Sequence, residues 1–477
     1  LSFYTSSDDR IGYIPTVDAS PYGHLSPDRN AVVSLLGELA CLAWDQPGTM
    51  TVSAAAALAR HVMPKDVLID QTYLVSSGDE FDRSACLKSL ADAGYRSVST
   101  VEDPGTFAVR GGIIDVFPPQ ERRPLRIELW GDEVESIQVF EPTTQRTLGD
   151  NLDSVFLAPV REELLVEPFL SRARRTIREA AADVGQPTRQ LQPILDDLNN
   201  GIPFMGIEAY RSGFFEEMDS VFDYIPTDSV IVVYDPMGVN ERYRSLWDDY
   251  QKARERALKD ETASLDVPAH LSAPNDLKTR LDQYSSLRAH VLQMVDDLGA
   301  VEGPDEAIQV RVPHHGTLRT ALEQSRGEQL PLKPLAKWVR QHIESGVHIL
   351  ITARQETQLD RVERVLKNFG VMVERRDGTA DPFASLSIEP KATLIPGDLT
   401  EGFALPSHGF CLVTEQEIFG RKLPKRRRQT VDATSPFVQD FRQLKPGDTI
   451  VHVDHGLGKY QGLKKLTMGG HEHDFLV

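Results

Sequence analysis

The pattern of apolar and polar positions divides the chain into stretches of different secondary structure. Ser26-Pro27-Asp28 is a helix-start sequence, with a capping serine, a proline suited to the first turn and an acid at the positive end of the dipole. A second helix is predicted between Ser53 and Pro64, and Val67 to Ile69 is interpreted as a short buried strand. The first helix is expected to bury apolar residues at helical spacing: Val32, Leu35, Leu36, Leu39 and Leu42.

Beyond Asp70 the pattern becomes strand-like. A helix is predicted from Phe81 to Ala93, closed by Gly94. Gly131-Asp132 is a two-residue hairpin signal, and Gly111-Gly112 is interpreted as a bulge or bend. Four strands surround these glycines and complete a compact α+β insert: Phe107 to Arg110, Ile113 to Phe117, Leu125 to Trp130 and Glu133 to Phe140.

Helices and strands alternate again after the insert, whereas residues 260–335 show no clear pattern. Residues 445–477 combine short strands with many glycines, which is typical of a small barrel. The predicted helices are Leu164 to Leu198, Asn240 to Lys259 and Gln355 to Asn368, and the predicted strands are Val230 to Tyr234, Val347 to Thr352, Val371 to Glu374 and Phe410 to Thr414.

These elements predict a multidomain fold of α/β and α+β type. One α/β domain is expected to be interrupted by the insert and resumed after it, and a second, smaller α/β domain precedes the barrel. The expected boundaries are 1–71 and 159–300 for the interrupted domain, 72–158 for the insert, 301–420 for the small α/β domain, 421–440 for a basic polar linker and 441–477 for the barrel.

Composition places the chain among globular proteins. Its 477 residues are 40% hydrophobic and 26% charged, with no apolar run close to 18 residues and no signal-peptide pattern at the start. We therefore expect a cytoplasmic protein that does not contact membranes.

Cys41, Cys86 and Cys411 lie far apart, which predicts buried thiols in a reducing compartment. The chain lacks an initial Met and stops within a predicted strand, so we expect it to be cut at both ends.

The net charge of -19 opposes binding to nucleic-acid phosphates, which requires clustered Lys and Arg. We therefore expect any DNA contact to be made outside this chain. The basic run at 421–428 is interpreted as a solvated, flexible connection, with a contact to phosphate or to an acidic surface as the alternative.

Motifs for catalysis and cofactor binding are missing from the sequence. There is no G-x-x-x-x-G-K-[ST] phosphate loop and no G-x-S-x-G elbow. The glycines of 456–462 have the wrong spacing for a dinucleotide loop, which favours a place in barrel strands. His452 and His455 point to opposite faces of a predicted strand, so structural or surface histidines are favoured over a zinc site that would include His471 and His473. We predict no catalytic residue, metal or cofactor in this chain.

The predicted strand LRIELW carries the best candidate site. Its apolar residues must face the core, which leaves Arg126, Glu128 and Trp130 on the other face. Arg110, in an earlier strand, also faces outward. An exposed Trp beside two Arg is typical of a binding hot spot. The alternative is that Trp130 folds over the hairpin end while the arginines pair with Glu128 and Glu135.

Long motifs resemble the transcription-repair coupling factor family, Mfd. FAVRGGIIDVFPP and LRIELWGDEVESIQVFEPTTQRTL resemble a module that this family shares with the damage-recognition subunit UvrB. LKPGDTIVHVDHGLGKYQGL with HDFLV resembles the family's RNA-polymerase-interacting domain, a Tudor-like barrel related to CarD. IPTVDASPYGHLSPD and DLTEGFALPSHGFCLVTEQEIFGRKLPKRRR resemble two further segments, in the family's order.

The resemblance implies a degenerate, helicase-like α/β domain that carries an inserted domain. In the family this insert recruits UvrA through two arginines and an aromatic residue, which are matched here by Arg110, Arg126 and Trp130. The barrel of the family binds the β subunit of RNA polymerase through an apolar residue matched by Leu476, for which ordinary barrel core is the alternative.

The implied function is that of a monomeric, non-catalytic adaptor that links stalled RNA polymerase to UvrA for transcription-coupled nucleotide excision repair. The family's ATP-dependent DNA translocase motor, with its ATP and magnesium, would follow Val477, and DNA would be contacted only through it. The alternative is a UvrB-like, nucleic-acid-dependent ATPase or damage-recognition subunit with an unrecognised nucleotide site.

Overall fold

The computed structural model divides the chain into two compact units of mixed α/β structure, which confirms a multidomain α/β protein. Unit 1 is residues 1–310, and unit 2 is residues 311–378 and 385–477. Within the described part of the chain, no helix is long and apolar enough to cross a membrane. The structure describes residues 11–17, 20–23, 26–44, 50–290, 312–313, 315–327, 330–376, 390–405 and 408–420, and the backbone of strands at 449–452, 456–459, 463–468 and 471–476.

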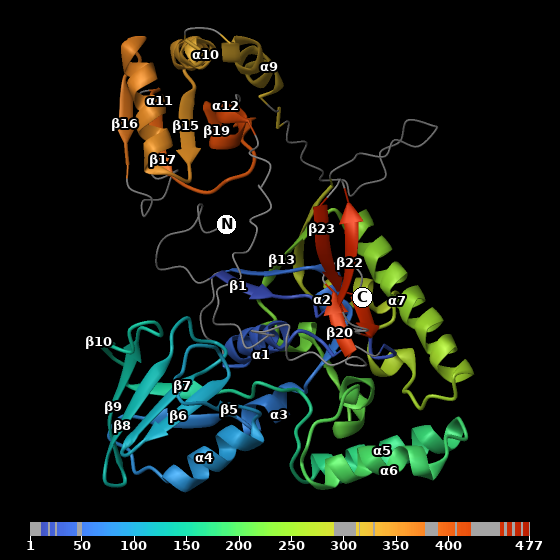
Figure 1. Ribbon diagram of the computed structural model, residues 1–477. Helices are drawn as coiled ribbons and strands as arrows, with labels where there is room; N and C mark the ends of the chain where they lie inside the picture. The colour runs from blue at the N-terminus through green and yellow to red at the C-terminus, as the bar shows by residue number, and fades with distance from the viewer. Residues whose placement is uncertain are drawn as a thin grey trace. The chain divides into compact units, whose positions relative to one another are not determined.

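Unit 1 consists of an insert and of the elements before and after it, which together we call the host (Figure 1). Before the insert, β1 (Ile11–Ile14) pairs in parallel with β2 (Met50–Ser53), and α1 (Arg29–Ala43) connects them. The host elements that follow are α2 (Ala55–Ala59), β3 (His61–Val62), α3 (Lys65–Asp70), α5 (Phe169–Asp183), α6 (Thr188–Asn199), η1 (Ile207–Phe214), β12 (Asp219–Ser220), η2 (Val221–Tyr224), β13 (Val230–Tyr234), α7 (Pro236–Lys259), η3 (Val267–Ala269), α8 (Asp276–Leu281) and β14 (Ser285–Ala289).

α1 begins slightly later than its start sequence suggests. The carboxylate of Asp28 accepts a hydrogen bond from the Asn30 amide at 3.1 Å, so the N-cap is Asp28 rather than Ser26. All five apolar residues predicted for its inner face belong to the host core or pack against it. The helical spacing therefore identified the buried face of α1 correctly.

Two other predictions for the host are wrong. Val67 to Ile69 is not a strand but the middle of α3, because three consecutive apolar residues fit either period and here only Leu68 is buried. The helix predicted up to Pro64 ends at Ala59, and β3 follows it and pairs with β12. α7 also starts before the predicted Asn240, at Pro236, whose missing N–H suits the first turn.

The insert is a six-stranded sheet with α4 (Arg83–Asp92) packed against one face (Figure 1). The predicted strands at 125–130 and 133–140 are confirmed, and Gly94 ends the helical segment with a φ of 91°. In sheet order, the strands are β10 (Thr147–Asn151), β9 (Glu133–Phe140), β8 (Leu125–Trp130), β7 (Ile113–Phe117), β6 (Thr106–Arg110) and β5 (Arg96–Ser97).

The two ends of the insert lie side by side. The chain enters through β4 (Tyr73–Ser76) and leaves through β11 (Ser154–Leu157), and these two strands pair antiparallel. The host chain therefore resumes next to the point where it was interrupted, and the insert keeps a core of its own that α4 shares with the inner face of the sheet.

α1 also holds the insert against the host. Val33 belongs to the core of the insert, although its helical neighbours face the host core. The guanidinium of Arg29 donates hydrogen bonds to the carbonyls of Pro104 and Gly105, at 3.4 and 3.0 Å. A β-carbon at Gly37 would lie 2.3 Å from the carbonyl oxygen of Pro119. The absence of a side chain at Gly37 therefore permits the close approach of α1 to the insert.

A buried ion cluster joins distant host segments. Arg60, after α2, donates to both carboxylate oxygens of Glu162, which follows the insert, and Arg211 of η1 lies 3.7 Å from the same carboxylate. Burial raises the pKa of Glu162, but the two arginines outweigh it and hold that pKa below its ordinary value. Burial and the charge of Glu162 together raise the pKa of the adjacent Glu163 to about 7.

Unit 2 contains a five-stranded sheet in the order β16-β17-β15-β19-β18, parallel except for the pair of β18 and β19. The predicted parallel strand is β15, which is buried along its whole length. The linker predicted at 421–440 lies outside the described residues, and two antiparallel hairpins follow it. The elements are α9 (Gly316–Gln324), η4 (Ser325–Gly327), α10 (Lys333–Glu344), β15 (His348–Ala353), α11 (Glu356–Asn368), β16 (Val373–Arg375), β17 (Ala392–Pro396), β18 (Phe403–Leu405), β19 (Phe410–Thr414), α12 (Glu415–Phe419), β20 (Thr449–His452), β21 (Gly456–Lys459), β22 (Leu463–Met468) and β23 (His471–Leu476).

We predict that Gly37→Ala destabilises the chain, although alanine is the better helix former. The added β-carbon meets backbone atoms of the insert that cannot rotate away, and such overpacking costs about 1–3 kcal/mol. Urea denaturation should show a lower midpoint for this variant. Ser34→Ala, at an exposed position of the same helix, is the control and should leave the midpoint unchanged or raise it slightly. A Gly37→Ala variant as stable as the parent would contradict the close approach.

We predict that Glu163→Gln stabilises the chain at pH 8 but changes little at pH 5. The pKa of Glu163 is raised from 4.5 to about 7 by folding, so the folded state favours the protonated form. The stability that this protonation provides falls between pH 4.5 and 7 as the unfolded chain releases its proton first. The gain from Gln should grow by about 1–3 kcal/mol between pH 5 and pH 8 in urea denaturation. Glu179→Gln, on the exposed side of α5, should show no such pH dependence.

Candidate protein-docking site

The outer face of the insert sheet is the face that α4 does not cover, and the register of β6 to β9 decides which side chains share it. Asp115 lies opposite both Ala108 and Arg126. In the neighbouring row, Ile113 lies opposite Arg110 and Glu128. Paired residues of adjacent strands point to the same side of a sheet. The pairing therefore brings the two predicted arginines onto one face, with Asp115 between them.

The predicted alternation along β8 is confirmed. Leu125 and Ile127 are fully buried in the insert core and Leu129 packs against it. Trp130 pairs with Glu133 at the end of the hairpin, beyond which Gly131 adopts a φ of 63°. The Trp130 residue is 78% exposed, so it does not fold over the hairpin end. An aromatic side chain this exposed is unusual on a solvated surface.

Gly111-Gly112 forms the two-residue loop of the β6–β7 hairpin and is not a bulge. Arg110 and Ile113 pair directly across it, and Gly111 has a φ of 59°, which favours glycine in a tight turn. A β-carbon at Gly112 would lie 3.0 Å from the carbonyl oxygen of Leu129. The loop thus packs closely against β8 and places Arg110 at the same end of the sheet as Trp130.

Asp115 is the acid that sequence reasoning missed. Its carboxylate is 1% exposed and accepts hydrogen bonds from Nε and Nη2 of Arg126, at 2.7 and 3.0 Å. The hydrogen bonds from Arg126 to Asp115 are the main cause that raises the pKa of this guanidinium. The suggested pairing of the arginines with Glu128 and Glu135 is therefore wrong, and Glu128 instead accepts a hydrogen bond from Ser136.

Arg110 and Arg126 differ in the exposed fraction of their side chains and so in how readily they could contact a partner. The Arg126 side chain is 15% exposed, and its guanidinium also lies over the Phe140 ring at 4.9 Å from the centroid. The Arg110 side chain is 48% exposed, lies 3.7 Å from the Asp115 carboxylate and donates to the carbonyl of Ser99. Arg110 can turn toward a partner at little cost, whereas Arg126 is held in place.

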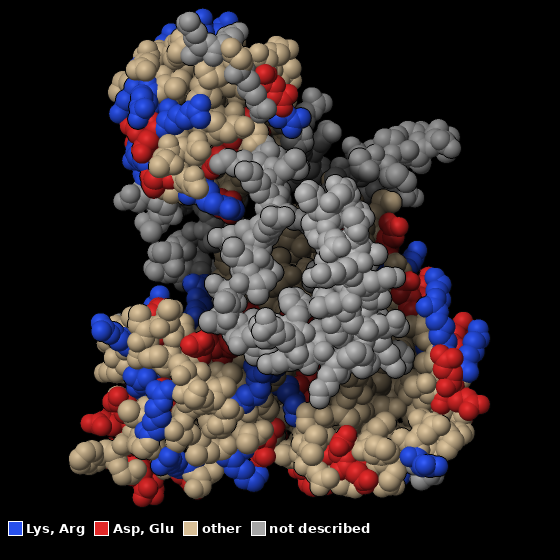
Figure 2. Space-filling model, in the orientation of Figure 1, with Lys and Arg blue, Asp and Glu red and all other residues tan. Residues whose placement is uncertain are grey.

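Asp115 is buried because half of the outer face is covered. A small apolar cluster lies on that half, formed by Val101, Ala108, Phe117 and Phe140. The other half is open, and we call it the docking face: Arg110, Ile113, Glu128 and Trp130. In the view of Figure 2, basic and acidic side chains are interspersed over unit 1, without a large field of one sign. A docking face with one half-exposed cation, one acid and one aromatic ring suits a protein surface better than a nucleic-acid backbone.

Leu476, the residue predicted to contact RNA polymerase, is the last residue of β23 and pairs with Leu463. Its side chain lies outside the described residues, as do those of His452, His471 and His473. Elsewhere in the described part of the chain, no group of three or more His, Cys, Asp or Glu could hold a metal ion.

Two segments of the chain match known domain families. Residues 74–162 match the UvrB interaction domain, and residues 444–477 match the CarD-like/TRCF RID domain. The first match begins at β4 and ends five residues after β11, so it covers the insert with its paired entry and exit strands. The class of protein is thus a mixed α/β host that carries an inserted domain similar to the UvrB interaction domain.

Curated relatives confirm the resemblance along nearly the whole chain. The chain is 34% identical to the transcription-repair-coupling factor of Myxococcus xanthus, over 98% of the chain and 39% of that protein. It is 26% identical to the transcription-repair-coupling factor of Haemophilus influenzae, over 100% of the chain and 40% of that protein. For the Escherichia coli protein of the same name the identity is 23%, over 99% of the chain and 39% of that protein. The chain is therefore similar to transcription-repair coupling factors and spans about 40% of their length.

We predict that Arg126→Ala destabilises folding, whereas Trp130→Ala does not. Removing Arg126 leaves the buried Asp115 carboxylate without its main partner, which costs about 3 kcal/mol. Truncation of an exposed Trp130 should change the free energy of unfolding by less than about 0.5 kcal/mol. Urea denaturation should separate the two variants.

The double variant Asp115→Asn/Arg126→Met is the control for this pair, because it removes both charges together. It should recover at least half of the stability lost in Arg126→Ala. If Arg126→Ala is as stable as the parent, the carboxylate does not depend on Arg126.

Proposed function

We propose that this chain is the adaptor segment of a transcription-repair coupling factor, which links stalled RNA polymerase to UvrA for transcription-coupled nucleotide excision repair. The observation that carries the proposal is the exposed Trp130 beside Arg110, on the open half of a domain similar to the UvrB interaction domain. The similarity of residues 444–477 to an RNA-polymerase-interacting domain supports a second docking site near the end of the chain, which we call the second docking end.

The chemistry of the docking face supports an interaction with UvrA. Trp and Arg are the residues most enriched among binding hot spots, because they combine a large contact area with hydrogen bonds. Trp130 offers an apolar plate, Arg110 a cation that can turn outward, and Glu128 a fixed acid. Arg126 has little exposed surface, so we assign it to the rim of the interface and to the support of Asp115.

The same proposal assigns catalysis to a part that this chain does not include. The relatives are longer, and we place the ATP-dependent DNA translocase motor, with its ATP and magnesium, in the remaining part of such proteins. The absence of a phosphate-loop motif from the sequence supports a host domain that is helicase-like in architecture but does not bind nucleotide. We assign contact with DNA to that motor, and we expect this chain to act as a monomer.

At the other end, we propose that residues 444–477 belong to a Tudor-like, CarD-related barrel that binds the β subunit of RNA polymerase. The hairpins β20–β21 and β22–β23 are compatible with strands of such a barrel. Leu476, at the end of β23, is the residue that we propose for this contact.

UvrA binding tests the first docking end. Trp130→Ala and Arg110→Ala should each weaken the affinity for UvrA by about 1–4 kcal/mol, or roughly five- to several-hundred-fold, as expected of hot-spot residues. Titration calorimetry with purified UvrA measures this, and thermal unfolding checks that both variants remain folded. Leu74→Ala removes an exposed apolar side chain from β4, away from the docking face, and should bind like the parent. Equal binding by all three variants would refute the docking face.

A polymerase pull-down without DNA tests the second docking end. The chain should retain the β subunit, and Leu476→Arg should reduce the retained amount because a cation replaces an apolar contact. Leu330→Arg, at an exposed apolar position of unit 2, is the matched control and should bind normally. Normal binding by a folded Leu476→Arg variant would mean that Leu476 is not the contact.

A further inference from the structure

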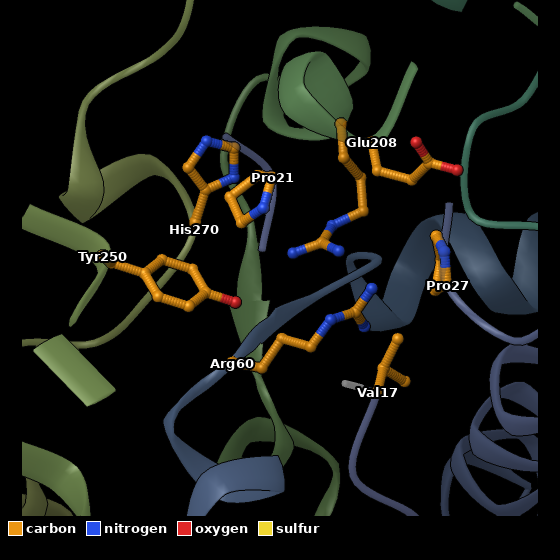
Figure 3. Close-up of a pocket in the computed structure, with 8 residues that line it drawn as sticks. Val17, Pro21, Pro27, Arg60, Glu208, Tyr250 and His270 are labelled. Carbon is orange, nitrogen blue, oxygen red and sulfur yellow. The ribbon is translucent and has the colours of Figure 1, made fainter. Parts of the chain in front are cut away.

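A small pocket in the host part of unit 1 lies beside the buried ion cluster (Figure 3). Its walls come from segments far apart in the sequence, including Arg60, Arg211, Tyr250 and His270. The Tyr250 hydroxyl and the Arg60 guanidinium point into the pocket, the His270 ring lies beside Pro21, and the Glu208 carboxylate points away from the Arg60 guanidinium (Figure 3). The space holds about one water-sized particle.

Arg211 carries a charge that the cluster neutralises only in part, through Glu162 and the nearby buried Glu163. Both carboxylate oxygens of Glu162 accept hydrogen bonds from Arg60. Arg211 lies 3.7 Å from this carboxylate, beyond hydrogen-bond distance. One Arg211 donor is used by the carbonyl of His61, at 3.0 Å. Its Nε is buried and has no hydrogen-bond partner among the described residues. A buried guanidinium with an unused donor and without a carboxylate at hydrogen-bond distance is costly, and native proteins normally satisfy such groups.

His270 is a second unsatisfied group that lines the pocket. It is 1% exposed, and neither ring nitrogen has a hydrogen-bond partner among the described residues. Its ring meets the edge of Tyr22, which fixes its orientation but satisfies no polar atom. Arg211 and His270 thus both line this small pocket and both have nitrogens without a hydrogen-bond partner among the described residues.

The charges that act on His270 are positive. Burial, together with the charges of Arg211 and Arg60, lowers the pKa of His270 to about 3. Burial and the charge of Arg211 also lower the pKa of His61. Both histidines are therefore neutral at pH 7, and the field that keeps them neutral favours an anion in the adjoining space.

We propose that this pocket binds one small monovalent anion of the size of chloride, held by Arg211 and His270. A water molecule would satisfy the same donors but would leave the charge of Arg211 only partly balanced by Glu162 and Glu163. A larger oxyanion would not fit into a space for one water-sized particle. A bound anion would complete the charge balance of the cluster that joins α2, η1 and the segment after the insert.

Anomalous diffraction tests the identity of the occupant in the unaltered protein. Crystals grown with bromide in place of chloride should show an anomalous peak in contact with Arg211 Nε at the bromine absorption edge. Density at this position without an anomalous signal would identify a water molecule and would overturn the proposal.

Thermal unfolding tests whether the anion stabilises the folded chain. At constant pH and ionic strength, replacing gluconate by chloride should raise the midpoint along a saturable curve, because a ligand that binds only the folded state stabilises it. Arg211→Met should lose this dependence, and His270→Phe should weaken it. Arg178→Met, on the exposed side of α5, should keep the dependence of the parent. A midpoint that depends on ionic strength alone, with the same chloride response in all variants, would refute the site.

Discussion

The buried pair of Arg60 and Glu162 is the interaction on which the arrangement of unit 1 depends. Arg60 lies before the insert and Glu162 lies directly after it, so their contact closes the host chain around the interruption. The paired strands β4 and β11 bring the chain back to the correct place, and the ion pair then fixes it there. Because both charges are buried, loss of either partner deprives the other of its hydrogen-bonded counter-charge. This constraint fixes the base of the insert, which α1 also holds through Val33 and Arg29, and leaves the outer face of the sheet open.

On the outer face of the insert sheet, the residues that stabilise the fold are different from those that are exposed for binding. Asp115 and Arg126 occupy the covered half, where they satisfy each other and support the sheet. Trp130 and Arg110 occupy the open half, where they contribute little to folding and remain available for a partner. Two residues that look equivalent in the sequence, Arg110 and Arg126, therefore have different main roles. Loss of binding after a change at Arg126 would reflect the fold as well as the interface.

Much of the insert could be predicted from the sequence because strand alternation and turn glycines are local signals. β8 and β9 have the predicted bounds, and Trp130 faces outward for the predicted reason. Short apolar runs are ambiguous, and for that reason residues 67–69 were assigned to a strand instead of α3. Asp115 could not be recognised as buried, because its burial depends on an apolar cluster assembled from four separate segments. The pocket at Arg211 also joins distant segments, and no local pattern indicates it.

The central claim is that the open half of the insert sheet is where UvrA docks. Hydrogen exchange of the backbone amides, measured with and without UvrA, tests this claim over the whole chain at once. If UvrA docks there, exchange should slow in the two hairpin tips, residues 110–113 and 128–133, and should stay unchanged in α5 and α6 of the host. Unchanged exchange in both tips, together with protection elsewhere in the chain, would contradict it.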